Sequence, residues 1–197
     1  MKKALLLVCI LSVSVVTTAC INNLAVQELN NKAAVYMEKG NYTEAIERLK
    51  SSIDLDDSVY ATHYNLGIAY TKNSEYQNAI NSYRKVIELN PEFADAYYSL
   101  AVAEEDILTE VYSNKLEFDD AGQLVPVEEK DDEEAQIVKG KSFDEKTNAY
   151  LNEITADAVK NYELYLKKGQ EISDRAEVEA RIAELKSNLA TQKAAAE

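Results

Sequence analysis

The sequence has little of the chemistry on which most active sites depend. It contains two cysteines, Cys9 and Cys20, both near the amino terminus, and one histidine, His63. A zinc site or a catalytic histidine needs partners of these types at fixed spacings, and the sequence shows no such arrangement. It also has no phosphate-binding loop and no recognisable pair of nucleophile and base. We therefore expect neither an enzyme nor a bound metal or cofactor, and we expect His63 to pack between helices.

The sequence also has few basic side chains relative to acidic ones. The chain has 35 acidic and 21 basic side chains, which gives a net charge of −14 at pH 7. Such a chain repels nucleic acids and anionic headgroups, so we expect neither as a binding partner. The densest acidic run, Glu128 to Glu134, could attract Ca²⁺. It lacks the alternating carboxylates of a calcium loop, however, so a solvated charge run is the favoured interpretation.

Long apolar runs are missing apart from Ala4 to Val16, which is too short to span a bilayer comfortably. Two lysines precede this run and small residues follow it, a pattern that predicts a signal peptide over residues 1–19. Thr17-Thr18-Ala19-Cys20 resembles the bacterial lipobox, with Thr17 where Leu is usual. This resemblance implies that Cys20 is lipidated and that residues 20–26 form a tether. An ordinary cleaved signal and an uncleaved anchor are the alternatives.

What the chain does contain is an internal repeat. Its best-preserved copy runs from Tyr60 to Phe93 and includes Leu66-Gly67-x-x-Tyr70, then Ala79-x-x-x-Tyr83, then Pro91. The pairs that match at an offset of 34 residues include Tyr36 and Tyr70, Tyr42 and Tyr76, Ala45 and Ala79, Ile46 and Ile80, and Ile53 and Ile87. This period and pattern resemble the tetratricopeptide repeat, with His63 where that family usually has Trp.

The spacing also explains physically why each repeat should be a helical hairpin. Apolar residues recur three and four apart, so they form one stripe on each of two helices. Gly67 and Ala79 are small where those helices should approach most closely, and Tyr83 supplies bulk between them. One hairpin leaves an apolar face bare, so hairpins must stack. We therefore predict an all-α, tetratricopeptide-type solenoid of about three repeats over residues 27–190.

The third repeat is interrupted by a long acidic insertion. Tyr97 and Leu100 lie 34 residues beyond His63 and Leu66, but the matching second helix appears only around Tyr162. The displacement predicts an insertion of 45 residues, at about 105–149, that lengthens both helices of the hairpin. Within it we expect an exposed loop over 116–142, including two short extended pieces around a Gly-bearing turn. After the insertion, Ser173-Asp174 can cap a last helix to about Leu189, followed by a frayed tail over 191–197.

The family resemblance implies a binding surface as well. In tetratricopeptide repeats the first helices line a concave groove, which the fifth, ninth and twelfth positions of each repeat face. The corresponding residues are Asn30, Ala34 and Met37; Tyr64, Ile68 and Thr71; and Tyr98, Val102 and Glu105. Tyr64 and Tyr98 could anchor a partner peptide, since aromatic side chains give a large contact area. The alternative is that the third hairpin or the last helix folds back and covers them.

These observations predict a bacterial envelope lipoprotein that binds a protein or peptide partner as an adaptor. We expect it to be lipid-anchored in the outer membrane and to face the periplasm, with a secreted or periplasmic protein as the alternative. Chaperone-binding members of the family use a basic clamp for a terminal carboxylate. Here the groove offers only Asn30 and nearby Lys72, so that partner class is not expected. The second candidate function is binding of a partner or cation by the acidic insertion.

Overall fold

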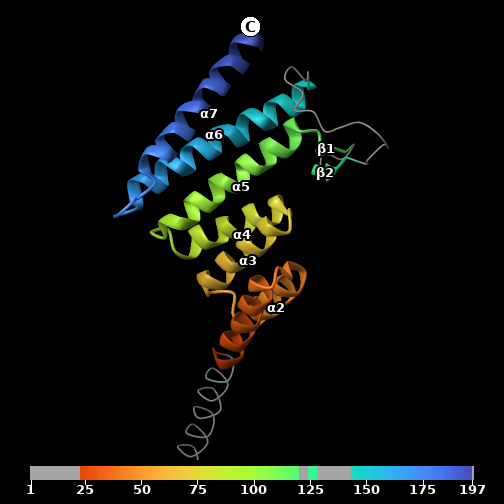
Figure 1. The fold of residues 1–197 in the computed structure, drawn as a ribbon, viewed down its shortest axis with the longest axis vertical. Coiled ribbons are helices and arrows are strands. Elements are labelled where there is room, and N and C mark those ends of the chain that lie inside the picture. Colours follow the sequence, from red (N-terminus) through yellow and green to blue (C-terminus); the bar gives the residue numbers. More distant parts are fainter. Residues whose placement is uncertain (1–22, 120–123, 128–142, 197) are drawn as a thin grey trace, which may run out of the picture. The chain divides into compact units, whose positions relative to one another are not determined.

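The computed structural model describes residues 23–119, 124–127 and 143–196 and divides the chain into two compact units (Figure 1). The first unit is Met1–Asn90 and the second is Pro91–Glu197. The predicted signal peptide, Cys20 and the acidic run at 128–134 lie outside the described residues. In the described part, no helix is both long and apolar enough to cross a membrane.

The first unit consists of two helical hairpins, as the repeat predicts. Its elements are an N-terminal helix over residues 23–38, then α2 (Tyr42–Leu55), α3 (Tyr60–Lys72) and α4 (Tyr76–Leu89). The predicted packing stripes are confirmed, because Leu66 and Tyr70 on α3 and Tyr83 on α4 are all buried. A Cβ atom added to Gly67 would lie 2.5 Å from Cε1 of Tyr83, so α3 and α4 approach closely at this point.

The turn between the two helices of a hairpin is the same each time. Gly40, the predicted left-handed cap, has φ +74°, and Ser74, one period later, has φ +60°. In both turns the next residue donates a backbone hydrogen bond of 2.9 Å to the carbonyl five residues earlier: Asn41 to Tyr36, and Glu75 to Tyr70. This Schellman geometry satisfies carbonyls that a helix end would otherwise leave bare.

The second unit contains the interrupted third hairpin. Its elements are α5 (Ala94–Tyr112), β1 (Leu116–Phe118), β2 (Leu124–Pro126), α6 (Glu145–Lys168) and α7 (Arg175–Ala196). The predicted lengthening is confirmed, since α5 has 19 residues where α3 has 13, and α6 has 24 where α4 has 14. Ile107 and Val111 on α5, and Leu151 on α6, continue the buried stripes into the added turns.

The insertion begins with a small antiparallel hairpin. It starts after the same turn as before, because Asn114 has φ +60° and Lys115 donates to the Glu110 carbonyl at 2.9 Å. Strands β1 and β2 pair with Glu117 opposite Val125, which confirms the two predicted extended pieces. The expected exposure is wrong for Phe118, however. Its ring is half-buried and meets Tyr150 of α6 edge to face at 4.9 Å, because an apolar side chain beside a lengthened helix gains by packing on it.

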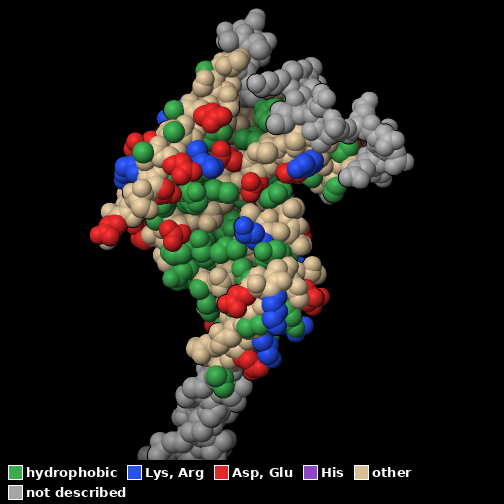
Figure 2. Space-filling model, in the orientation of Figure 1, with side chains coloured by type: hydrophobic (Ala, Val, Ile, Leu, Met, Phe, Trp, Pro, Cys, Tyr) green, Lys and Arg blue, Asp and Glu red, His purple; other side chains and the backbone are tan. Residues whose placement is uncertain are grey.

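The last helix starts where expected and ends later. The Asp174 carbonyl accepts hydrogen bonds from the N–H groups of Glu177 and Val178, and Val178 and Leu185 are buried. The backbone is helical to Ala196, and alanine is the best helix former, while fraying of residues 191–197 stays a prediction. Figure 2 shows acidic and basic side chains interspersed over this part of the molecule. One such pair is Lys186 and Glu163, at 2.7 Å.

Candidate binding surface

In the first unit, Asn30 ties three helices together. Its Nδ2 donates to the Val26 carbonyl at 2.9 Å, to Oγ of Ser52 on α2 at 2.9 Å and to Oγ1 of Thr62 on α3 at 3.0 Å. Ser52 and Thr62 are buried, so each hydroxyl needs a partner inside the protein. This predicted groove residue therefore fixes the N-terminal helix beside α3, and its amide nitrogen is already engaged.

A pocket of about 310 Å³ opens between the N-terminal helix and α3. The residues that line it are Val26, Gln27, Asn30, Asn31, Val59, Ala61, Thr62 and Asn65. None of them carries a charge, and four of them are side-chain amides. Sequence reasoning missed Asn31 and Asn65, although they lie 34 residues apart and so occupy equivalent positions in successive repeats.

The remaining predicted groove residues of this unit differ in exposure. Ala34 is exposed, whereas Met37, Tyr64, Ile68 and Thr71 are half-buried. The ring of Tyr64 lies 5.9 Å from that of Tyr83, and Oγ1 of Thr71 lies 3.2 Å from the Tyr83 hydroxyl oxygen. The Thr71 hydroxyl also donates to the Gly67 carbonyl at 3.0 Å. Buried Tyr83 on α4 thus supports two of the predicted side chains on α3.

In the second unit, the predicted side chains on α5 are packed against later helices. Tyr98, Val102 and Glu105 are half-buried. The Tyr98 ring lies 5.1 Å from Tyr165 and 5.8 Å from Tyr162, both on α6. For Tyr98, this packing resembles the alternative stated above, in which the third hairpin covers the predicted groove tyrosines. Tyr64 and Tyr98 belong to different units, so their stacking stays a prediction.

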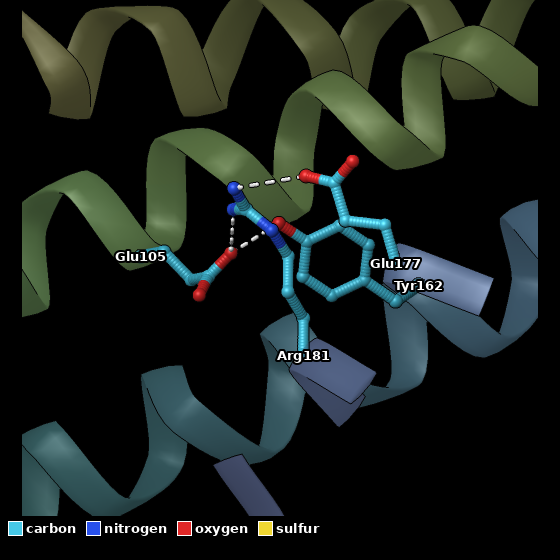
Figure 3. Close-up of polar contacts among 4 residues, drawn as sticks. All are labelled: Glu105, Tyr162, Glu177 and Arg181. Atoms are coloured by element: carbon cyan, nitrogen blue, oxygen red, sulfur yellow. Dashed lines mark hydrogen bonds and ion pairs between the residues drawn. The ribbon is translucent and has the colours of Figure 1, made fainter. Parts of the chain in front are cut away.

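Glu105 is the centre of a polar cluster that joins α5, α6 and α7 (Figure 3). Its Oε2 accepts hydrogen bonds from the Tyr162 hydroxyl and from Nη1 of Arg181, the latter at 3.1 Å. Arg181 also lies near Glu177, with Nη2 3.6 Å from Oε1. Burial raises the pKa of Tyr162, and the Glu105 carboxylate raises it further, so the phenol stays a neutral donor. The charge of Glu105 is therefore compensated within its own unit.

A second buried carboxyl lies beside this cluster. Glu104 is fully buried, and its Oε2 accepts a hydrogen bond of 2.9 Å from Nδ2 of Asn161 on α6. Nearby, Tyr165 donates to Oδ1 of Asp174 at 3.1 Å, and burial together with that carboxylate raises the pKa of Tyr165 to about 12. Sequence reasoning missed these tyrosine, asparagine and arginine contacts. The signal was present in Glu104, which stands at the position of the buried Tyr70 in the preceding repeat.

His63 has the packing role that was predicted. Its side chain is 7% exposed, and Nε2 lies 2.8 Å from the Asp57 carbonyl oxygen. Among the described residues, no group of three or more His, Cys, Asp or Glu side chains is placed to hold a metal ion. The geometry of the first unit offers uncharged hydrogen-bonding groups around a small pocket.

Comparisons with known proteins agree with this architecture. Residues 60–93 match the tetratricopeptide repeat family model, and residues 33–74 match a TPR repeat model. The photosystem I assembly protein Ycf3 of Dioscorea elephantipes is 38% identical over 68 residues, which is 32% of this chain and 39% of that protein. The NADPH oxidase activator of Dictyostelium discoideum is 32% identical over 73 residues, 37% of this chain and 12% of that protein. The chain therefore spans well under half the length of these relatives.

Solved structures extend the likeness over most of the chain. The first TPR of Spaghetti (RPAP3), bound to the HSP90 peptide SRMEEVD, has a TM-score of 0.56 at 16% identity and covers 85% of this chain and 94% of that one. The Arabidopsis OM64 TPR domain has a TM-score of 0.56 at 12% identity, covering 83% and 98%. At such identities the likeness concerns the fold alone. The predicted fold class is confirmed: this is an all-α protein built from tetratricopeptide-type helical hairpins.

Proposed function

We propose that this chain is a bacterial envelope lipoprotein that acts as an adaptor, binding a protein or peptide segment on the first-helix face of its repeats. The observation that carries the binding role is the pocket between the N-terminal helix and α3, the first helices of two successive repeats. Tetratricopeptide folds are suited to protein–protein interaction, and a preformed concave site lowers the ordering cost of binding. No catalytic step forms part of this proposal.

The chemistry of the pocket favours a partner other than an acidic chaperone tail. The HSP90 peptide SRMEEVD, named for one structural neighbour, carries three acidic side chains. The pocket residues include no Lys or Arg to oppose such charges, and the whole chain has a net charge of −14. An acidic peptide would therefore be repelled at long range and unpaired on contact.

The binding face can be tested inside the cell with a photo-crosslinking amino acid. Ala34 is exposed at a predicted groove position, and Glu88 is exposed on α4 and serves as the matched control. We expect the crosslinker at Ala34, and not at Glu88, to capture one defined partner. Equal capture at both positions, or capture at neither, would contradict an adaptor that uses the first-helix face.

The envelope part of the proposal rests on the sequence of residues 1–20. Its support is the short apolar run after two lysines and the lipobox-like segment that ends at Cys20. Acyl chains would then hold the protein at the membrane by burying CH₂ groups at about 0.8 kcal/mol each. We expect Cys20→Ser to release the protein from membranes or to leave it unprocessed. A wild-type protein found in the soluble fraction with residue 21 or a later one at its amino terminus would exclude lipid anchoring.

A further inference from the structure

The first unit exposes large apolar side chains at one end. Leu24, Leu55 and Tyr60 are 67%, 41% and 37% exposed, and we refer to these three residues as the apolar end. We propose that the apolar end docks on the surface of a bilayer of zwitterionic phospholipids. This inference rests on the proposed lipid anchor at Cys20, and it adds a second, noncovalent contact between the protein and the membrane.

Hydrogen bonds between helices place the three side chains at the same end of the unit. The Asn30 amide nitrogen donates to Ser52 on α2 and to Thr62 on α3, and the Ser52 hydroxyl also reaches the Val26 carbonyl at 3.5 Å. The residues of the apolar end are only two or three positions away from Val26, Ser52 and Thr62 in the chain, which is less than one helical turn. They stand at the start of the N-terminal helix, the end of α2 and the start of α3.

The predicted site of lipid attachment is close to this end. The N-terminal helix begins at residue 23, so residues 21 and 22 alone separate it from Cys20. Three residue steps span at most about 11 Å, and the headgroup layer of a bilayer is about 5–8 Å thick. An acylated Cys20 therefore keeps Leu24 near the headgroups. Because a short tether gives a high effective concentration, even a weak contact with the bilayer surface is formed much of the time.

The charged groups at this end select the kind of lipid. Asp54 and Asp57 are exposed, and Asp56 accepts hydrogen bonds from the Ser58 hydroxyl at 2.6 Å and from its backbone N–H at 3.0 Å. These two bonds lower the pKa of the Asp56 carboxyl, so the group stays ionised at neutral pH. Three carboxylates repel anionic headgroups, whereas the ammonium group of a choline or ethanolamine headgroup attracts them.

The apolar side chains suit a membrane interface. Tyrosine combines an apolar ring with a polar hydroxyl, and it is enriched where hydrocarbon meets water. Leu24 and Leu55 add apolar area that gains by leaving water. Val35 is 47% exposed on the same helix as Leu24 but lies 11 residues farther on. That distance is about 16 Å along a helix, so Val35 is a matched control for position.

Single tryptophans test the docking, because the chain has no tryptophan of its own. Leu24→Trp, Tyr60→Trp and the control Val35→Trp are each made in the full-length protein, which is purified in detergent and reconstituted into phosphatidylcholine vesicles. Lipids that carry bromine in their acyl chains quench a tryptophan that enters the bilayer surface. We expect brominated lipid to lower the emission of Leu24→Trp and Tyr60→Trp by about half, and that of Val35→Trp by less than about a tenth.

Two further measurements test the apolar and the charged part of the argument. In the Tyr60→Trp protein, Leu55→Glu should reduce the quenching to the level of the control, whereas Val35→Glu should leave it unchanged. Both changes are at exposed positions, so circular dichroism should show an intact fold. Replacing half of the lipid with phosphatidylglycerol should lower the quenching by about twofold at low salt, and added salt should restore it.

The outcomes separate this inference from the anchor on which it rests. Vesicle flotation with quenching at residues 24 and 60, but not at 35, supports both. Flotation with equal quenching at all three positions overturns the docking and leaves the lipid anchor standing, and a protein that does not float with the vesicles overturns both. Quenching that grows with phosphatidylglycerol overturns the choice of zwitterionic lipid. An emission shift that follows protein concentration and ignores brominated lipid makes a second copy of the chain the occupant, which also overturns the docking.

Discussion

The two units contain the same helical hairpin but differ in what their groove-register side chains contact. In the first unit Asn30 lines an uncharged pocket and Ala34 is exposed, whereas Tyr64 and Thr71 contact Tyr83 of α4. In the second unit the equivalent helix, α5, directs Tyr98 and Glu105 against α6 and α7. The first unit therefore leaves Ala34 exposed on its first-helix face, whereas the second unit binds Glu105 to a third helix.

The difference follows from the residues at equivalent positions. Tyr162 of α6 corresponds to Tyr83 of α4, but Tyr165 stands where α4 has Val86, so Tyr98 meets a second ring. A carboxylate that becomes partly buried there needs a donor, and Arg181 of α7 and the Tyr162 hydroxyl both provide one. Repeats with the same period therefore differ in what packs beside their first helix.

The largest expected effect is the loss of stability when the buried tyrosine that both units share is replaced. Tyr83 on α4 and Tyr162 on α6 occupy corresponding buried positions, with exposures of 2% and 0%. Replacing either with Ala should lower the free energy of unfolding by about 3–5 kcal/mol, because a large cavity forms. Chemical denaturation of both variants measures this loss. Tyr60→Ala is the control, since Tyr60 is 37% exposed and should cost much less.

Alkaline unfolding should separate the two units. The pKa of Tyr165 is raised from 10.0 to about 12, first by burial and then by Asp174, and the pKa of Tyr162 is raised as well. A phenol whose folded pKa lies above its unfolded value stabilises the fold fully below pH 10, and this contribution is lost as pH rises through 12. Denaturation series with tyrosinate absorbance should show the second unit weakening in that window. If Tyr165→Phe changed nothing in the pH dependence, Tyr165 would not be a source of it.

The Glu105–Arg181 pair allows the stabilisation of the second unit by its polar cluster to be measured. A double-mutant cycle of Glu105→Gln and Arg181→Gln should give a coupling energy of about 1 kcal/mol, reduced by solvent because the Arg181 side chain is 40% exposed. The exposed pair Arg175–Glu179, at 3.7 Å, is the control and should couple by only about 0.3 kcal/mol. Equal coupling in the two pairs would show that the cluster adds nothing beyond a surface ion pair.

Much of the fold could be predicted because the repeat period encodes it. Leu66, Gly67, Tyr70 and Tyr83 specify which faces meet, and the offset of the later copy located the insertion and its lengthened helices. The packing of Phe118 on Tyr150 could not be predicted in this way. It depends on where a strand outside the repeat lies against an added helical turn, and periodicity carries no information about that.

The candidate site was less predictable, for a related reason. Family register predicts Asn30 as a groove residue but not its three hydrogen bonds, because two of its acceptors lie on other helices. Glu105 packs against α7 because Arg181 donates a hydrogen bond to it. Arg181 lies between the buried residues Val178 and Leu185 on one face of α7. A charged side chain on such a stripe signals that a partner must exist, but the sequence does not say which one.

The smallest effect concerns the turn that all three hairpins share. Ser74 and Asn114 hold φ values of +60° at the position that Gly40 occupies in the first hairpin. A non-glycine residue in this region is strained, and asparagine tolerates it better than serine. We expect Ser74→Gly to raise the free energy of unfolding by about 0.5–1 kcal/mol, and Asn114→Gly to raise it by less. Gly40→Ala should have the opposite sign, since it introduces the same strain. Denaturant midpoints of the three variants test this order. A destabilised Ser74→Gly would mean that the serine contributes more to its turn than its backbone angle costs.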